Sequence, residues 1–299
     1  MAHSNFSPTT LRKGTLIATL SAMSFGSAVV FIRYAFQVGV TPITAAFLRF
    51  TLAALMLVIL LSASRGWSPI SARRAIILIG LGVFMYTTAG VTWLTAFSLI
   101  PAWLVSLIIA LHPLIVTLGS WLFLRERLRW PQLLALLTVL LGSACLFWRP
   151  FEGAAWTGIW LMLLNVVVSA AYLLIGQRWT RDLPPLTSTI WLVSGGMLGT
   201  LTYGLLFKQL SFAFAPSGWF WMVLFAAVST VLAVSMLWWG INLIGPSRTA
   251  ILGSFEPVFS IVLAVLLLGE SLQPLQVAGG VLILVGMFLV QWHPGGGER

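Results

Sequence analysis

Charged residues are scarce in this chain of 299 residues. Only 7% are Asp, Glu, Lys or Arg, and the acidic ones number six. Apolar residues make up 60% of the chain, and the mean hydropathy is +1.03. Soluble domains carry about 25% charged residues, so this composition excludes an ordinary water-soluble domain. The sequence predicts a polytopic membrane protein.

Cysteine and histidine are also rare. The single cysteine, Cys145, lies in an apolar segment without a partner, which excludes a disulfide framework and a thiolate metal site. His3 and His293 lie in the tails, so His112 has no second histidine with which to form a metal cluster. A GxxxxGK(S/T) phosphate-binding loop is missing too. The sequence therefore predicts no metal, no other cofactor and no ATP-driven step.

Apolar windows of membrane-spanning length recur along the chain. About 20 mainly apolar residues cross the ~30 Å hydrocarbon core as a helix, and long continuous runs, rather than alternation, exclude a closed barrel. A GxxxG pattern at Gly195 and Gly199 predicts a close helix contact. We predict an all-α protein with ten transmembrane helices, at residues 14–36, 41–64, 75–97, 101–123, 131–148, 155–177, 185–207, 217–242, 247–268 and 274–292.

The basic residues are divided unequally between the two sides of these spans. With the N-terminus inside, the outer loops receive only Arg149 and Lys208. Cytoplasmic loops of membrane proteins carry an excess of Lys and Arg, so both termini are predicted to be cytoplasmic. The net charge of +10 then follows the membrane topology, and no nucleic-acid partner is predicted. The predicted inner side holds Arg12, Lys13, Arg65, Arg73, Arg74, Arg125, Arg127, Arg129, Arg178, Arg181, Arg248 and Arg299.

The chain contains an internal repeat. Pro113 matches Pro257 and Glu126 matches Glu270, each at an offset of 144 (257 − 113 = 144). Gln132 and Gly142 match Gln276 and Gly286 at the same offset. We predict two repeats, at residues 14–148 and 155–292, with five helices each. An odd number of helices places the second copy upside down, which is the inverted-topology arrangement of many secondary transporters, here around a central cavity.

These segments resemble the drug/metabolite transporter superfamily, and within it the EamA-like family. The matching stretches are "FGSAVVFIRYAF", "PITAAFLRFTLAALML", "HPLIVTLGSWLFLRERL" and "GPSRTAILGSFEPVFSIVLAVLLLGESL". The resemblance implies export of small metabolites across a bacterial inner membrane by a ten-helix bundle. It extends to amino acid exporters of the YddG type. His112 departs from the family pattern, in which a small or apolar residue precedes the proline of the fourth helix.

Two polar residues near the predicted bilayer midplane each precede a proline. Glu256 lies beside Pro257 in the ninth span, and His112 lies beside Pro113 in the fourth. Proline removes one helical hydrogen bond, so both helices are predicted to break there and to act in gating. A midplane charge costs ~2.5 to 3.5 kcal/mol, so Glu256 should face the bundle interior. It binds a substrate amine or a proton, or it fixes packing; His112 lines the cavity or is a satisfied interior histidine.

Further polar and aromatic residues are predicted to line the cavity. Such walls suit amphipathic zwitterions better than sugars or phosphates. Any one aromatic residue at such a position is more often a packing residue than a ligand contact. The predicted substrate-binding set is Tyr86, His112, Asn165, Tyr172, Thr230, Trp239 and Glu256.

Two arginines lie within the spans. Arg33 is close enough to an outer end to reach the headgroups. Arg49 is deeper, and we expect it to pair with a carbonyl or a carboxylate, with a structural or lipid contact favoured over binding of an anionic substrate.

The sequence therefore favours a secondary exporter of amino acids or related amphipathic compounds, whose partners are a small-molecule substrate and the lipid bilayer. Alternatives are a multidrug exporter with cationic substrates, a membrane-embedded lipid-modifying enzyme, and a channel or scaffold. The enzyme reading has weak support, because one Glu and one His at the midplane are few groups for catalysis. The oligomeric state is left open, with a monomer among the options.

Overall fold

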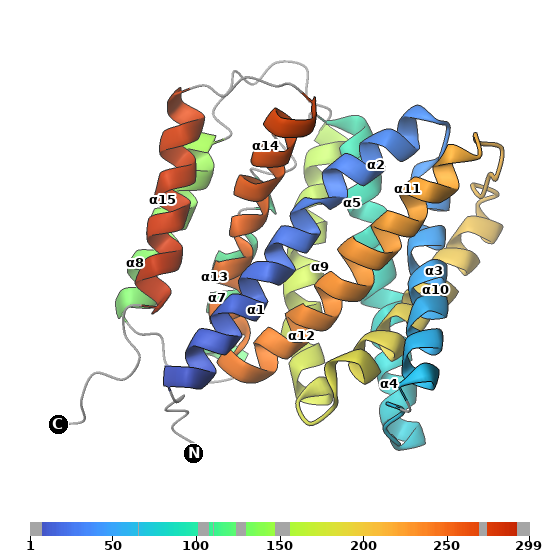
Figure 1. Cartoon of the computed structure of the whole chain (residues 1–299), viewed down its shortest axis with the longest axis horizontal. Coiled ribbons are helices and arrows are strands. Elements are labelled where there is room, and N and C mark those ends of the chain that lie inside the picture. The colour runs from blue at the N-terminus through green and yellow to red at the C-terminus, as the bar shows by residue number, and fades with distance from the viewer. Residues whose placement is uncertain are drawn as a thin grey trace.

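The protein is a bundle of helices (Figure 1). A computed structural model describes residues 8–64, 66–100, 108–109, 111–123, 130–146, 156–268 and 274–291, and these residues contain no β-strand. The predicted all-α class is confirmed for them. The ends of the two predicted repeats, at residues 148, 155 and 292, lie outside the described residues, as do Glu126, Glu270, His3 and His293.

The described helices overlap the predicted spans, but the predicted spans 14–36 and 247–268 are each divided into two helices. The first half contains α1 (Pro8–Gly26), α2 (Ala28–Gln37), α3 (Pro42–Ala63), α4 (Ala72–Leu81), the π-helical turn η1 (Gly82–Tyr86), α5 (Thr87–Leu99), α7 (His112–Phe123) and α8 (Trp130–Leu146). The second half contains α9 (Trp156–Thr180), α10 (Pro185–Leu206), α11 (Ser217–Ala226), the π-helical turn η2 (Ala227–Leu232), α12 (Ala233–Ile244), α13 (Pro246–Gly253), α14 (Phe255–Leu268) and α15 (Pro274–Gln291).

Several of these helices have the length and apolarity of membrane spans. Within the described residues, six segments meet both criteria: Thr9–Gln37, Pro42–Ala63, Ala72–Phe97, Trp156–Thr180, Pro185–Leu206 and Ser217–Ile244. Shorter apolar helices occur at His112–Phe123, Leu133–Cys145 and Val277–Gly286. The chain is therefore a multi-pass helical membrane protein. Residues 101–107 of the predicted fourth span lie outside the described residues.

Helix breaks occur at both predicted prolines. Ser254 separates α13 from α14, and Leu111 is a turn residue immediately before α7. Pro113 and Pro257 therefore lie in the first turn of α7 and of α14, where a missing N–H costs no helical hydrogen bond. The predicted breaks are confirmed at the level of the backbone.

Each half contains a π-helical turn within one membrane span. The turn η1 lies in the predicted third span and η2 in the predicted eighth, which are equivalent in the repeat. Adding the repeat offset of 144 to Gly82–Tyr86 gives 226–230, which overlaps η2. A π-helical turn shifts hydrogen bonding to i+5 and frees backbone groups, and such turns are frequent at functional sites. The sequence carried no signal for either turn, because no proline or glycine pair marks them both.

The two halves interlock through equivalent contacts. The helix that opens each half packs on the other half: α1 runs along α12, and α9 runs along α5. A Cβ atom on Gly14 would lie 2.4 Å from the Ile244 side chain, and one on Gly158 would lie 2.5 Å from Ile100. Both pairs are related by the offset of 144, so the same close approach is made twice. At one edge of the bundle α15 packs along α8, away from α3 and α10 (Figure 1).

Candidate functional site

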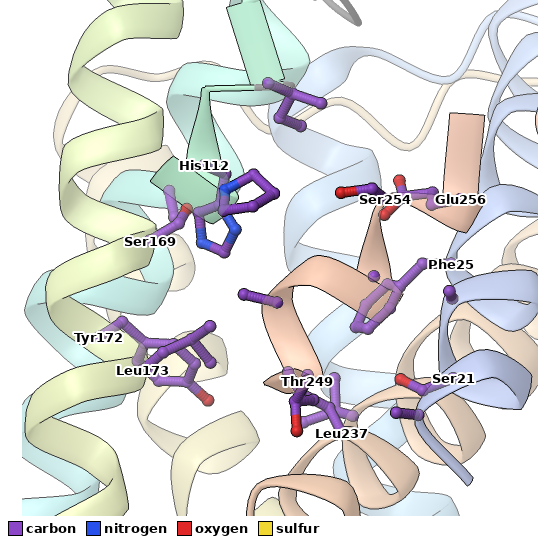
Figure 2. Close-up of a pocket in the computed structure, with 18 of the residues that line it drawn as sticks. Ser21, Phe25, His112, Ser169, Tyr172, Leu173, Leu237, Thr249, Ser254 and Glu256 are labelled. Atoms are coloured by element: carbon purple, nitrogen blue, oxygen red, sulfur yellow. The ribbon is translucent and has the colours of Figure 1, made fainter. Parts of the chain in front are cut away.

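A cavity of about 230 Å³ lies between helices of both halves. In Figure 2, α7 and α9 form one side of the cavity, and α1, α13 and α14 form the other; η1 and α12 also contribute lining residues. Most of the lining is apolar, with a few polar groups among it, which is the usual character of a small-molecule site. Of the predicted substrate-binding set, the structure brings Tyr86, His112, Asn165, Tyr172 and Glu256 together here, and Pro113 joins them.

Glu256 lies at the cavity wall where α14 begins. No hydrogen bond or ion pair to its carboxylate is found among the described residues. The break between α1 and α2 packs directly on its backbone, because a Cβ on Gly26 would lie 2.7 Å from the Glu256 carbonyl oxygen. The Ser260 hydroxyl lies 2.9 Å from both the Gly26 and the Glu256 carbonyl oxygens, to which it donates. Glu256 is thus fixed at the junction of two broken helices.

His112 faces Glu256 across the upper part of the cavity in Figure 2. His112 is the first residue of α7, and Glu256 is the second residue of α14. The two residues therefore occupy similar places in their helices, as the repeat predicts. In Figure 2 the imidazole ring of His112 lies beside Ser169 of α9. Ile109 and Gly253, each four residues before one of the two prolines, line the same cavity.

Tyr86 and Tyr172 form an aromatic wall. Their rings stack with centroids 5.0 Å apart, and Trp238 meets Tyr172 edge-on at 5.4 Å. Tyr172 is 5% exposed, so its ring is held from most sides. The hydroxyl groups of both tyrosines are buried and, within the described part of the chain, neither makes a hydrogen bond. Since a buried hydroxyl without a partner costs roughly 1 to 3 kcal/mol, these groups are available to a bound molecule.

Asn165 has a structural bond as well as a place in the lining. Its amide nitrogen donates to the Ala89 carbonyl at 2.6 Å and to the Thr92 hydroxyl at 3.2 Å. These bonds tie α9 to α5 across the two halves. The side chain therefore fixes the position of the cavity wall whether or not it also contacts a substrate.

The structure places Thr230 and Trp239 away from this cavity lining. Thr230 is fully buried in η2 and accepts a hydrogen bond from Arg49 Nε at 2.7 Å. Trp239 is 39% exposed, and the Lys13 ammonium lies 5.2 Å from its ring centroid. Both residues were predicted to line the cavity from their positions along the spans, but their side chains contact Arg49 and Lys13 instead. The side chain of Pro257 is outside the described residues.

Several small polar residues of the lining were missed by the sequence reasoning. Buried hydroxyls of Ser143 and Ser254 face the cavity without a hydrogen bond to any described residue. Ser21 donates to the Ala233 carbonyl at 2.8 Å, and Thr249 donates to the Gly245 carbonyl at 2.8 Å. Serine and threonine are common in membrane helices, so only their position in the fold distinguishes these from others.

Comparison with known proteins gives the family. The EamA-like transporter family model matches the chain twice, over residues 12–148 and 156–292. The chain belongs to the EamA-like transporter family. It is accordingly a membrane transporter, and the lipid-modifying enzyme considered from the sequence is set aside.

Relatives of this family member agree with the assignment. The chain is 25% identical over 259 residues to the uncharacterized transporter YyaM of Bacillus subtilis, a match covering 83% of each chain. It is 24% identical to an uncharacterized transporter of Archaeoglobus fulgidus, over 93% of this chain and 98% of that one. It is also 26% identical to the protein PecM of Dickeya dadantii, over 64% and 65% of the two chains. A solved crystal structure superposes with a TM-score of 0.77 at 19% identity, covering 93% of this chain and 96% of that one, which supports the fold.

Proposed function

We propose that this transporter is a secondary exporter of small amphipathic metabolites, of which amino acids with aromatic or other apolar side chains are the best candidates. The observation that carries the proposal is the cavity itself. It combines one carboxylate, that of Glu256, with an apolar lining and four buried hydroxyls that make no hydrogen bond to a described residue, on Tyr86, Ser143, Tyr172 and Ser254. A zwitterion with an apolar side chain satisfies these groups together.

The size of the cavity supports a metabolite over a drug. Sites for drug-sized ligands measure ~300–1,000 Å³, whereas this cavity measures about 230 Å³. The multidrug alternative would require a larger space in another state of the protein. The two proposals therefore differ in the size of substrate that they accept.

A panel of labelled substrates tests this function. In liposomes containing the purified protein, aromatic and branched apolar amino acids are expected to show saturable transport, while bulky aromatic cations show little. Liposomes without protein provide the control. Transport of the cations alone would contradict the amino acid proposal in favour of multidrug export, and flux without saturation would indicate a channel.

The transport cycle follows from the repeat. Two inverted five-helix units, 14–148 and 155–292, would rock about the cavity and open it alternately to the two sides of the inner membrane. The breaks at Pro113 and Pro257 would allow the movement. The equivalent packing of α1 on α12 and of α9 on α5 supports two related units. In Figure 1 α1 begins and α15 ends at the same end of the bundle, which supports termini on one side, by our proposal the cytoplasmic side.

Cysteine labelling tests this topology. On a Cys145→Ser background, a Gln209→Cys variant is expected to react with an impermeant maleimide in intact spheroplasts. A matched Ser64→Cys variant should react only after permeabilisation, because positive-inside loops lie in the cytoplasm. Gln209 and Ser64 are both exposed in loops of the bundle. The inverse labelling pattern would reverse the proposed orientation, and equal labelling of both in intact spheroplasts would contradict ends on opposite sides.

A further inference from the structure

Arg49 is held rigidly behind the wall of the cavity. On α3, its Nε donates to the Thr230 hydroxyl at 2.7 Å, and a second guanidinium nitrogen donates to the Ser229 carbonyl oxygen at 3.2 Å. Both acceptors belong to η2, so the π-helical turn supplies the carbonyl. The guanidinium carbon also lies 4.8 Å from the Phe225 ring centroid and 5.5 Å from that of Phe50. The predicted pairing with a carbonyl is confirmed.

The charge of Arg49 has no anionic partner in contact. Among the described residues no carboxylate makes an ion pair with it, and its hydrogen bonds go to neutral oxygens. An interior charge without a counter-charge is costly and is kept in membrane proteins mainly where it serves a function. The arginine therefore contributes a net positive potential to the space around it.

That potential reaches the tyrosine wall. Phe50, which Arg49 covers, packs against Tyr86 with ring centroids 4.8 Å apart, and Tyr86 stacks on Tyr172. The two tyrosine hydroxyls are donors without partners in the described structure. Donors in a positive potential are suited to an anion.

The opposite side of the cavity has the opposite charge. In Figure 2 Glu256 lies across the cavity from Tyr172, with the apolar side chains of Phe25, Leu173 and Leu237 between and around them. Lysine and arginine are missing from the described lining. Arg49 lies behind the tyrosines, so it contributes positive charge on this side of the cavity.

We propose that the wall formed by Tyr86 and Tyr172 binds the carboxylate of a zwitterionic substrate, and that Arg49 is the positioning residue that gives this wall its positive potential. The substrate amine then faces Glu256, and the apolar side chain lies against Phe25, Leu173 and Leu237. This assignment rests on the proposed amino acid transport and specifies how the substrate is oriented.

Three probes separate the two ends of the substrate. Binding of L-phenylalanine, its primary amide and 3-phenylpropionate is measured on the purified full-length protein in lipid nanodiscs. The amino acid should bind tightest, because each analogue loses one charged group. Tyr86→Phe removes the hydroxyl and keeps the ring. It should weaken phenylalanine binding about tenfold, as for loss of one hydrogen bond to a charged group, and leave amide binding unchanged.

The arginine is tested by the same ratio of affinities. Arg49→Gln should lower the preference for phenylalanine over the amide about tenfold, and Arg49→Lys should restore part of it by returning the charge. Tyr34→Phe is the matched control, since Tyr34 stacks on Trp221 and does not belong to the cavity lining. It should change neither affinity. Tyr86→Phe keeps the test decisive if Arg49→Gln does not fold.

The outcomes distinguish this assignment from the proposed function. If phenylalanine is bound and transported but its preference over the amide is unchanged in Tyr86→Phe and Arg49→Gln, the wall assignment is wrong and amino acid transport stands. Equal weakening of both probes shows a structural role only and also overturns it. If no amino acid binds the unmodified protein, both proposals are wrong.

Discussion

We expect Glu256 to carry the proton if transport is proton-coupled, so proton-driven uptake should fall to background when Glu256 is replaced by glutamine, while substrate counterflow continues. The amide cannot release or accept the proton that a coupled cycle must carry. Glu256 has the only carboxylate in the described lining of the cavity, so no other described group there can take its place. Counterflow exchanges labelled for unlabelled substrate without net proton movement, and it should persist at saturating substrate concentration.

The measurement compares accumulation driven by an imposed pH gradient with exchange in the same liposomes. We expect accumulation driven by the pH gradient to fall at least about a hundredfold and exchange to change less than about threefold. Accumulation needs a proton carrier in every cycle, whereas exchange does not. Asp182→Asn is the matched control, since this carboxylate is exposed in a loop between α9 and α10. Unchanged dependence of Glu256→Gln on the pH gradient would remove Glu256 from the coupling role.

A single methyl group added at Gly195 is expected to destabilise the folded state strongly. A Cβ atom there would lie 2.3 Å from the carbonyl oxygen of Ile79 and 2.8 Å from the Cα of Gly82. These are backbone atoms, so α10 and the α4–η1 segment would have to separate. The close contact predicted from the GxxxG pattern of Gly195 and Gly199 is confirmed by this approach.

Thermal unfolding of the detergent-solubilised protein checks this prediction. Gly195→Ala should cost about 1–3 kcal/mol or more, as overpacking does, and lower the yield of monodisperse protein. Gly80→Ala is the control. Gly80 lies on α4, the helix that Gly195 of α10 approaches, and no atom lies within 4 Å of its added Cβ. The variant should be neutral or stabilising by up to about 1 kcal/mol, from helix propensity. Equal shifts in the unfolding temperature for the two variants would contradict the contact.

The breaks beside Pro113 and Pro257 could be predicted because their cause is local. A proline lacks an N–H wherever it lies, and it is tolerated in the first turn of a helix. The placement of Glu256 and His112 at the cavity followed from the same two breaks and from the repeat. Tyr86 and Tyr172 were predicted because a polar aromatic residue within a span offers a ring and a hydroxyl, and such polar groups favour the bundle interior over lipid.

The contacts of Thr230 could not be predicted from the sequence. Thr230 is the equivalent of Tyr86 at an offset of 144, yet one residue lines the cavity and the other bonds to Arg49. The repeat places both residues at the same depth, but the neighbouring helices of the two halves differ. Arg49 in the first half corresponds to Leu192 in the second, at the offset of 143 that relates Pro42 to Pro185. A side chain's partner depends on the helix that packs against it.

The sequence by itself determined that this chain is a duplicated helical membrane protein with broken helices at two prolines, because apolar length, repeat offset and proline chemistry act within one segment. Tertiary structure alone decided which polar groups share the cavity, where the π-helical turns lie, and that Arg49 backs the tyrosine wall. Those features depend on how closely helices from the two halves approach each other. That distance is set by contacts between residues far apart in the chain, such as Gly14 with Ile244 and Gly195 with Ile79.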